Sequence, residues 1–293
     1  MRELHHRIIL KINKYFDVGP ILWVLRRIRY LSQADKKLIL TPKKSFTYQN
    51  TRRYYLLHPA AKTPRRIVLA LHAVRDSAKL FAYYSSLHNT VDEHTVVVYP
   101  EATWSWWRDQ GWNAKICCGP AMRKEIDDIG FLAALIEFLQ NTFHSTQPLP
   151  VYLVGYSNGG MLAQYFATKY PELCAGVFCF AASCGNCHGT LVPATLPFPV
   201  ALAHGTEDEH IPFFGGSSEF NDYGPWYSFD EMLSFWESAA GIHLNRVWSR
   251  VLRGVGHVWP GWRVEYPDRL HNFGAQLVTS FITYVEGKVS PKF

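Results

Sequence analysis

The stretch Val151-Tyr152-Leu153-Val154-Gly155-Tyr156-Ser157-Asn158-Gly159-Gly160-Met161 joins an apolar run to a helical pattern through a serine flanked by small residues. The apolar run predicts a strand that is buried on both faces. A G-x-S-x-G pattern between such a strand and a helix is typical of a nucleophile elbow, whose tight turn exposes the serine hydroxyl. We therefore predict that Ser157 is a nucleophile; the alternative is a glycine-rich turn with an idle serine.

Strand and helix patterns alternate on both sides of this turn. Strands are predicted over residues 53–58, 66–72, 95–99, 151–155, 176–181, 199–204 and 246–252. Helices are predicted over residues 77–88, 128–141, 158–170, 229–240 and 271–286, and Asp127 or Asp128 is expected to cap the second of them. This alternation predicts one α/β domain over residues 45–293, with a mostly parallel sheet and helices on both faces.

The positive charge is concentrated at the N-terminus. Residues 1–44 hold eleven Lys and Arg against three acids, a net +8, so the chain's net +6 leaves −2 for residues 45–293. A body of nearly neutral charge lacks the basic patch of a nucleic-acid-binding protein.

Residues 1–44 are predicted to form a basic, amphipathic, helical arm. Ile21, Val24, Leu25 and Ile28 recur at helical spacing, and the neighbouring arginines lie largely off that stripe. Such a helix either contacts an anionic membrane surface or packs its apolar face on the body. The apolar run at residues 21–25 is too short for a signal peptide or for the roughly 20 residues of a membrane span, which favours a cytoplasmic or membrane-peripheral protein over a secreted one.

A nucleophile elbow calls for an acid and then a histidine, each following a strand. His204-Gly205-Thr206-Glu207-Asp208 follows one predicted strand, and Gly254-Val255-Gly256-His257 follows the next. We predict His257 as the base and Asp208 as the acid that orients it, although spacing alone leaves Glu207 and Glu209 open. The other candidate histidines are expected to be structural or exposed: His204, His210, His243 and His271.

An oxyanion hole requires two backbone N–H donors. The first is expected from Asn158, directly after the nucleophile. The second is expected from Val74, in the loop that follows Leu71-His72-Ala73.

With these residues in place, the sequence from about Tyr54 to Val285 resembles the polyhydroxybutyrate depolymerase/feruloyl esterase family of α/β-hydrolases. The shared motifs are Leu71-His72, Val98-Tyr99-Pro100, Gly111-Trp112-Asn113-Ala114, Cys117-Cys118-Gly119, Asp127-Asp128-Ile129-Gly130-Phe131, the elbow through Met161, His204 to Asp208, Ile211-Pro212, Gly215-Gly216 and Gly256-His257-Val258-Trp259-Pro260-Gly261. The resemblance implies an α/β-hydrolase fold and places the family's serine, aspartate and histidine on Ser157, Asp208 and His257. It also implies a carboxylic-ester hydrolase (EC 3.1.1.-) acting on hydroxycinnamoyl or acetyl groups of plant polysaccharide, or on short polyesters.

Aromatic residues near these motifs are candidates for a substrate-binding wall. We expect Trp259, Trp112, Tyr156 and Phe213 to contribute to it; the alternative is that such rings belong to the core or rim. Two other functions remain open, namely an acyltransferase using the same three residues and a non-catalytic, membrane-associated binding protein. The oligomeric state is left open.

The six cysteines are Cys117, Cys118, Cys174, Cys179, Cys184 and Cys187. Cys184-Gly185-Asn186-Cys187-His188 matches a haem-attachment pattern, but the expected loop setting and the lack of a second cysteine pair favour a disulfide or thiols over haem or zinc. Cys117 and Cys118 either form a vicinal disulfide or pair elsewhere. We predict no cofactor and no metal.

Overall fold

A computed structural model of the protein describes residues 40–103, 110–143, 146–184, 196–218, 224–241, 244–261 and 272–287. The chain divides after Thr41 into two units, Met1–Thr41 and Pro42–Phe293, and every element below belongs to the second. The predicted arm therefore lies outside the described residues except for residues 40–44. Across the described ranges, none of the helices combines the length and apolarity of a membrane span.

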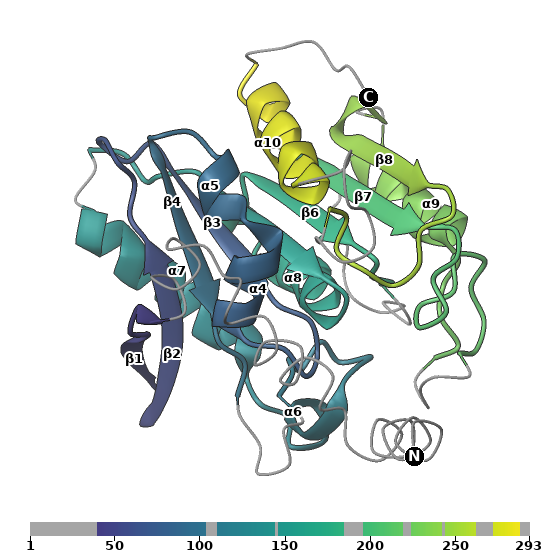
Figure 1. Ribbon diagram of the computed structural model, residues 1–293, viewed down its shortest axis with the longest axis horizontal. Coiled ribbons are helices and arrows are strands. Elements are labelled where there is room, and N and C mark those ends of the chain that lie inside the picture. Colours follow the sequence, from purple (N-terminus) through teal and green to yellow (C-terminus); the bar gives the residue numbers. More distant parts are fainter. Residues whose placement is uncertain are drawn as a thin grey trace, which may run out of the picture. The chain divides into compact units, whose positions relative to one another are not determined.

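The second unit is built on a single eight-stranded sheet with the order β1-β2-β4-β3-β5-β6-β7-β8 (Figure 1). The first two strands pair antiparallel with each other, β2 pairs antiparallel with β4, and the remaining pairs are parallel. The strands are β1 (Lys44–Tyr48), β2 (Thr51–His58), β3 (Arg66–Leu71), β4 (Thr95–Pro100), β5 (Val151–Tyr156), β6 (Gly176–Phe180), β7 (Val200–Gly205) and β8 (Val247–Leu252). The parallel strands bring their carboxyl ends to one edge, where sites of such sheets form.

Helices cover both faces of the sheet, as predicted. They are α4 (Ala78–Ser85), α5 (Leu87–Thr90), α6 (Gly119–Arg123), α7 (Asp128–Phe143), α8 (Asn158–Lys169), α9 (Phe229–Ala240) and α10 (Phe273–Val285), with short 3-10 turns η2 (Pro171–Leu173) and η3 (Leu244–Arg246).

Alternation along the strands decides which helices lie on which face. Leu69 and Leu153 share one buried cluster with residues of α7, α8 and α9. On the opposite face, Phe81 of α4 packs 6.5 Å from the ring of Tyr156, and Phe281 of α10 packs 6.1 Å from the ring of Phe178. Figure 1 shows α4, α5 and α10 together on this second side. The apolar strand runs are thus covered on both sides.

The structure differs from the predicted elements in three places. The helix predicted over residues 77–88 is broken at Ser86, whose left-handed φ of 49° separates α4 from α5. Strand β1 was not predicted because it is a largely exposed edge strand with no apolar run. The five-residue α6 is too short to show a periodic pattern. His271, at the predicted start of the last helix, lies outside the described residues.

Of the two candidate caps of α7, Asp127 fills the role. Its Oδ1 accepts the backbone N–H of Gly130 at 3.0 Å. Asp128 instead turns inward, and its Oδ1 accepts a hydrogen bond from the guanidinium of Arg53 at 2.6 Å. The two neighbouring aspartates therefore have separate structural tasks.

Candidate active site

Ser157 occupies a strained turn between β5 and α8. Its φ of 54° and ψ of −123° lie in a region that residues with a side chain rarely adopt. Two positions of the turn have room only for glycine. A Cβ on Gly155 would lie 2.3 Å from the carbonyl oxygen of Gly159, and a Cβ on Gly159 would lie 2.2 Å from the carbonyl oxygen of Leu71. Any larger residue would push the backbone apart, so the sequence Gly-x-Ser-x-Gly is what allows this geometry.

The three predicted side chains meet at the carboxyl edge of the sheet. His257 Nε2 lies 2.9 Å from Ser157 Oγ, and His257 Nδ1 lies 2.8 Å from Asp208 Oδ2. A carboxylate can only accept, so Nδ1 carries the proton and Nε2 is left to accept the serine hydroxyl. Residues that are 49 and 100 positions apart in the chain thus form one continuous row of hydrogen bonds.

Asp208 is the acid that contacts the histidine, whereas Glu207 and Glu209 are exposed. Its Oδ1 accepts the backbone N–H groups of His210 at 3.0 Å and Ile211 at 2.8 Å. Burial by itself raises the pKa of Asp208, but hydrogen bonds from His204 and His257 outweigh it and hold this pKa well below its ordinary value. The buried carboxyl is therefore an anion at neutral pH.

The loop of the histidine is fixed by the residue next to the nucleophile. The Tyr156 hydroxyl donates a hydrogen bond to the backbone carbonyl of His257 at 2.9 Å, and the two rings lie 5.4 Å apart. Tyr156 was expected in the substrate wall, but it is only 8% exposed. Its contact with His257 was missed because nothing in the local sequence links two residues this far apart.

A second imidazole lies beside the histidine. The ring of His210 is 4.9 Å from the ring of His257, and its side chain is exposed. Desolvation and the neighbouring His257 lower the pKa of His210. His210 is therefore neutral at pH 7 and adds no charge next to the base.

The segments expected to form the oxyanion hole lie close to one another. The side chain of Asn158 grips the backbone of Trp112 twice: Oδ1 accepts its N–H at 2.7 Å and Nδ2 donates to its carbonyl at 3.1 Å. A Cβ on Gly111 would lie 3.1 Å from Val74 Cγ2 and 3.4 Å from Asn158 Oδ1. The two residues predicted to supply amides thus flank one backbone segment. The amide of Asn158 is the first in α8, where helix N–H groups have no partner within the helix.

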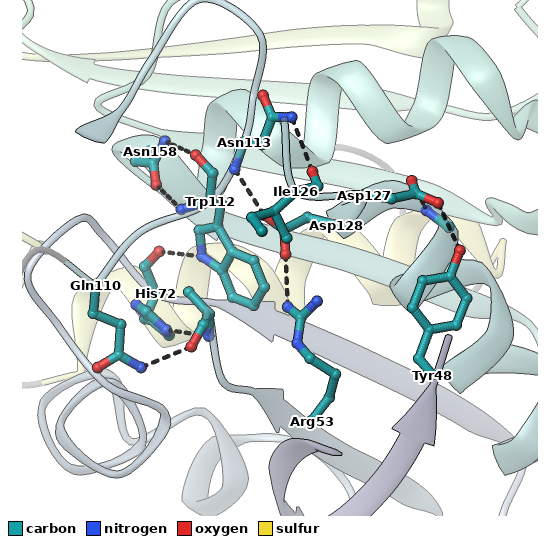
Figure 2. A network of polar contacts seen from close by, with 12 residues as sticks. Tyr48, Arg53, His72, Gln110, Trp112, Asn113, Ile126, Asp127, Asp128 and Asn158 are labelled. Atoms are coloured by element: carbon teal, nitrogen blue, oxygen red, sulfur yellow. Dashed lines mark hydrogen bonds and ion pairs between the residues drawn. The ribbon is translucent and has the colours of Figure 1, made fainter. Parts of the chain in front are cut away.

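Behind these amides, buried polar contacts fix the loops (Figure 2). Trp112 Nε1 donates to the carbonyl of His72 at 2.9 Å. His72 Nδ1 lies 2.7 Å from the carbonyl oxygen of Ala73, and its Nε2 accepts the N–H of Ala102 at 3.1 Å. Burial lowers the pKa of His72, so the ring is neutral. It joins the loops after β3 and β4.

A buried ion pair that the sequence did not reveal stabilises the segment around Trp112. Arg53 and Asp128 are paired at 2.6 Å with side chains 5% and 0% exposed, and the Arg53 guanidinium lies 3.9 Å from the ring centre of Phe131. Asp128 Oδ2 also accepts the N–H of Asn113 at 2.8 Å, next to Trp112 (Figure 2). Strand β2 and helix α7 are thereby connected to the segment that Asn158 grips.

Three of the four rings predicted to bind substrate are buried in the core: Tyr156, Trp112 and Trp259. Trp112 is 0% exposed and Trp259 is 1% exposed, so neither presents surface to a ligand in this structure. Trp259 packs edge-on against Phe81, with ring centres 5.2 Å apart. Phe213 is half-buried and stacks 5.2 Å from Phe229, and it is the most accessible of the four.

The described cysteines are one bonded pair and three buried thiols. Cys117 and Cys118 are joined as a vicinal disulfide. Cys174 and Cys179 are buried thiols whose pKa values are raised by burial. In the parts of the chain that the structure describes, no three His, Cys, Asp or Glu side chains converge as metal ligands. Cys187 and His188 lie outside those parts.

A comparison with protein families matches residues 59–223 to the phospholipase/carboxylesterase family. A curated relative, named "Putative esterase NocK" in Nocardia uniformis subsp. tsuyamanensis, is 31% identical over 174 residues. The match covers 57% of this chain and 48% of NocK, so the chain spans about half the length of the curated relative that it matches.

Solved structures of similar fold include an S-formylglutathione hydrolase from Agrobacterium tumefaciens and acyl-protein thioesterase 2 from Zea mays. The first is 14% identical with a TM-score of 0.55, and the match covers 85% of this chain and 95% of that one. The second is 12% identical with a TM-score of 0.55, and the match covers 79% of this chain and 98% of that one. At these identities the likeness concerns the fold alone.

Proposed function

The chain belongs to the phospholipase/carboxylesterase family and has the α/β-hydrolase fold, and from this premise we propose that it hydrolyses carboxylic esters through an acyl-enzyme on Ser157. The observation that carries the proposal is the unbroken contact from Ser157 Oγ to His257 Nε2 at 2.9 Å and from His257 Nδ1 to Asp208 Oδ2 at 2.8 Å. A serine hydroxyl is a weak nucleophile unless a base takes its proton, and this arrangement provides the base.

In the first half of the reaction, Ser157 Oγ attacks the ester carbonyl while its proton passes to His257 Nε2. The buried anion of Asp208 stabilises the imidazolium that forms. The tetrahedral intermediate places negative charge on the former carbonyl oxygen, and we propose the amides of Asn158 and Val74 as its donors. The C–O bond then breaks, and the alcohol leaves with the proton of His257.

In the second half, water replaces the alcohol. His257 takes a proton from water as the water oxygen attacks the acyl carbon, and it returns the proton to Ser157 Oγ when the acid leaves. An added alcohol that competes with water would make the same enzyme an acyltransferase, and product analysis separates the two reactions.

For the substrate we propose hydroxycinnamoyl, acetyl or short polyester groups, on the basis of the sequence motifs shared with polyhydroxybutyrate depolymerases and feruloyl esterases. The accessible aromatic surface next to the acid loop supports this choice: Phe214 is 84% exposed, and its ring lies 5.2 Å from that of the half-buried Phe213. An apolar or aryl acyl group would find contact there, whereas the buried tryptophans offer none.

The test combines active-site labelling with a substrate panel. The full chain and Ser157→Ala are treated with a fluorophosphonate probe and assayed on p-nitrophenyl esters of graded chain length, methyl ferulate and a short polyester. Ser249→Ala, an exposed serine of β8, is the control. We expect Ser157→Ala to lose labelling and on the order of 10⁴-fold or more of the hydrolysis rate, while the control is unchanged. Labelling or hydrolysis that persists in Ser157→Ala would refute the proposal.

A further inference from the structure

A second histidine contacts the acid of the proposed site, at the same carboxylate oxygen as His257. His204, at the end of β7, is 2% exposed. Its Nε2 lies 2.8 Å from the backbone carbonyl oxygen of Ile211 and 3.3 Å from Asp208 Oδ2. A carbonyl oxygen can only accept, so Nε2 carries a proton, which the carbonyl and the carboxylate share.

The other nitrogen of the same ring, Nδ1, makes no hydrogen bond to a described residue, and it is buried. The ring lies among aromatic side chains, 5.9 Å from Phe213 and 6.0 Å from Phe229. A buried polar atom without a partner destabilises the fold, and an apolar side chain would avoid that cost. Whatever favours a histidine here must therefore lie on its Nε2 side.

On that side, Asp208 is held at both oxygens. Oδ1 accepts two backbone N–H groups, from His210 and Ile211, and Oδ2 faces the nitrogens of His257 and His204. Without His204, Oδ2 would keep only His257 as a partner among the described residues, and rotation of the carboxylate about its bond to Cβ would be less restricted. The contact also joins the end of β7 to the loop that carries the acid.

We propose that His204 is a positioning residue, which holds the carboxylate of Asp208 in the orientation that His257 requires. This inference rests on the proposed function, because it assigns His204 a role through Asp208 and not a contact with substrate. It extends the row Ser157–His257–Asp208 by one member.

The electrostatic consequence has a definite sign. A carboxylate oxygen that shares its charge with a second donor attracts the proton of His257 Nδ1 less strongly. Removing His204 makes Asp208 a stronger acceptor for His257, so the imidazolium, which cannot take the serine proton, persists to higher pH. Among the described residues, His257 and Asp208 also have His210 beside them, which itself interacts with Glu209 and Arg75. The Tyr156 ring lies 5.4 Å from that of His257. None of these groups is changed by the substitution.

The experiment compares His204→Leu with His204→Gln in the full chain, using kcat, KM and the pH profile of kcat/KM on one p-nitrophenyl ester. Glutamine retains a side-chain N–H at nearly the place of Nε2, whereas leucine retains only the volume. Phe229→Leu is the packing control, because it loosens the same pocket without touching Asp208. Thermal unfolding is recorded for each variant.

We expect His204→Leu to lower kcat about tenfold with KM unchanged, which is the loss typical of a hydrogen bond to a charged group. The same variant should move the lower limb of the kcat/KM profile to higher pH. His204→Gln should restore both, and Phe229→Leu should lower the unfolding temperature without moving the limb. A His204→Leu profile that coincides with wild type, or a rate loss that glutamine does not repair and that leaves the limb in place, overturns the inference. Persistent activity in Ser157→Ala would instead refute the proposed function itself.

Discussion

At the scale of single residues, the site depends on groups whose protonation is fixed by what surrounds them. Asp208 is kept ionised by its hydrogen bonds from His204 and His257, and His72 is kept neutral by burial. These states could not be read from the sequence, where Asp208 stands between two glutamates of similar chemistry. The motif resemblance pointed to Asp208. The physical reason is that Asp208 is buried against His257, whereas Glu207 and Glu209 are exposed.

The first prediction concerns the acid. Asp208→Asn keeps the shape of the side chain but removes its charge and can present an N–H toward His257, which favours the wrong tautomer. We expect kcat to fall by about 10⁴-fold, as for comparable substitutions in serine proteases. The matched control is Glu209→Gln in the neighbouring exposed acid, for which kcat should change less than about twofold; steady-state kinetics on a p-nitrophenyl ester would detect either deviation.

The second prediction concerns Tyr156. Tyr156→Phe removes the hydroxyl that holds the backbone of His257 and leaves the ring in place. A neutral hydrogen bond contributes about 1 kcal/mol, so we expect kcat to fall about fivefold while KM stays constant. A rise in KM at constant kcat would show that Tyr156 binds substrate, as the sequence suggested, and does not position the base.

At the scale of elements, the sequence predicted the strands and helices that have a periodic apolar pattern and missed features that have none. Strand patterns, several of them continuous apolar runs, located β2 to β8, and turn residues located the elbow and both loops. The break at Ser86 and the edge strand β1 have no periodic pattern, so they were missed. The pair Arg53–Asp128 was missed because the partners are 75 residues apart. In the sequence Arg53 looks like a surface charge and Asp128 like a candidate helix cap.

The third prediction tests that pair. Asp128→Leu leaves the Arg53 guanidinium buried without a counter-ion and the Asn113 amide without its acceptor. We expect the free energy of unfolding to fall by about 3–5 kcal/mol in urea titrations, the range for breaking one half of a buried ion pair. The double variant Arg53→Met/Asp128→Leu should regain part of that loss, because no charge is then stranded. A double variant no more stable than Asp128→Leu would show that the ion pair is not the reason for the loss.

At the scale of the whole molecule, a second charged cluster stabilises the edge of the sheet where the parallel strand β3 begins, opposite to the edge that holds the site. Arg66, at the start of β3, is 4% exposed and pairs with Asp92 at 2.6 Å and with Glu286 after α10. It joins residues 220 positions apart in the chain. Because β3 begins here and ends beside Ser157, this cluster lies at the far end of the strand from the site, and its disruption should affect stability more than catalysis.

The fourth prediction gives this cluster a pH dependence. Although burial opposes ionisation, hydrogen bonds from Arg66 and Thr95 and the charge of Arg66 lower the pKa of Asp92 from 3.8 to about 2. The folded state therefore prefers the ionised form, so this contribution to stability is complete above about pH 4 and is lost as the pH falls toward 2. Arg66→Leu should lower the unfolding temperature at pH 7 and flatten its decline between pH 4 and 2, with kcat at pH 7 within about twofold of wild type. An unchanged acid decline in the variant would show that Asp92 does not carry it.

The measurement that tests the account most directly is the identification of the acylated residue. The full chain is mixed with p-nitrophenyl acetate, quenched in acid within the first turnovers, and analysed by intact-mass and peptide mass spectrometry. We expect one acetyl group per chain, located on Ser157 and lost again as hydrolysis proceeds, with none in Ser157→Ala. An acetyl group that resides on another side chain, or full ester turnover in Ser157→Ala, would contradict it.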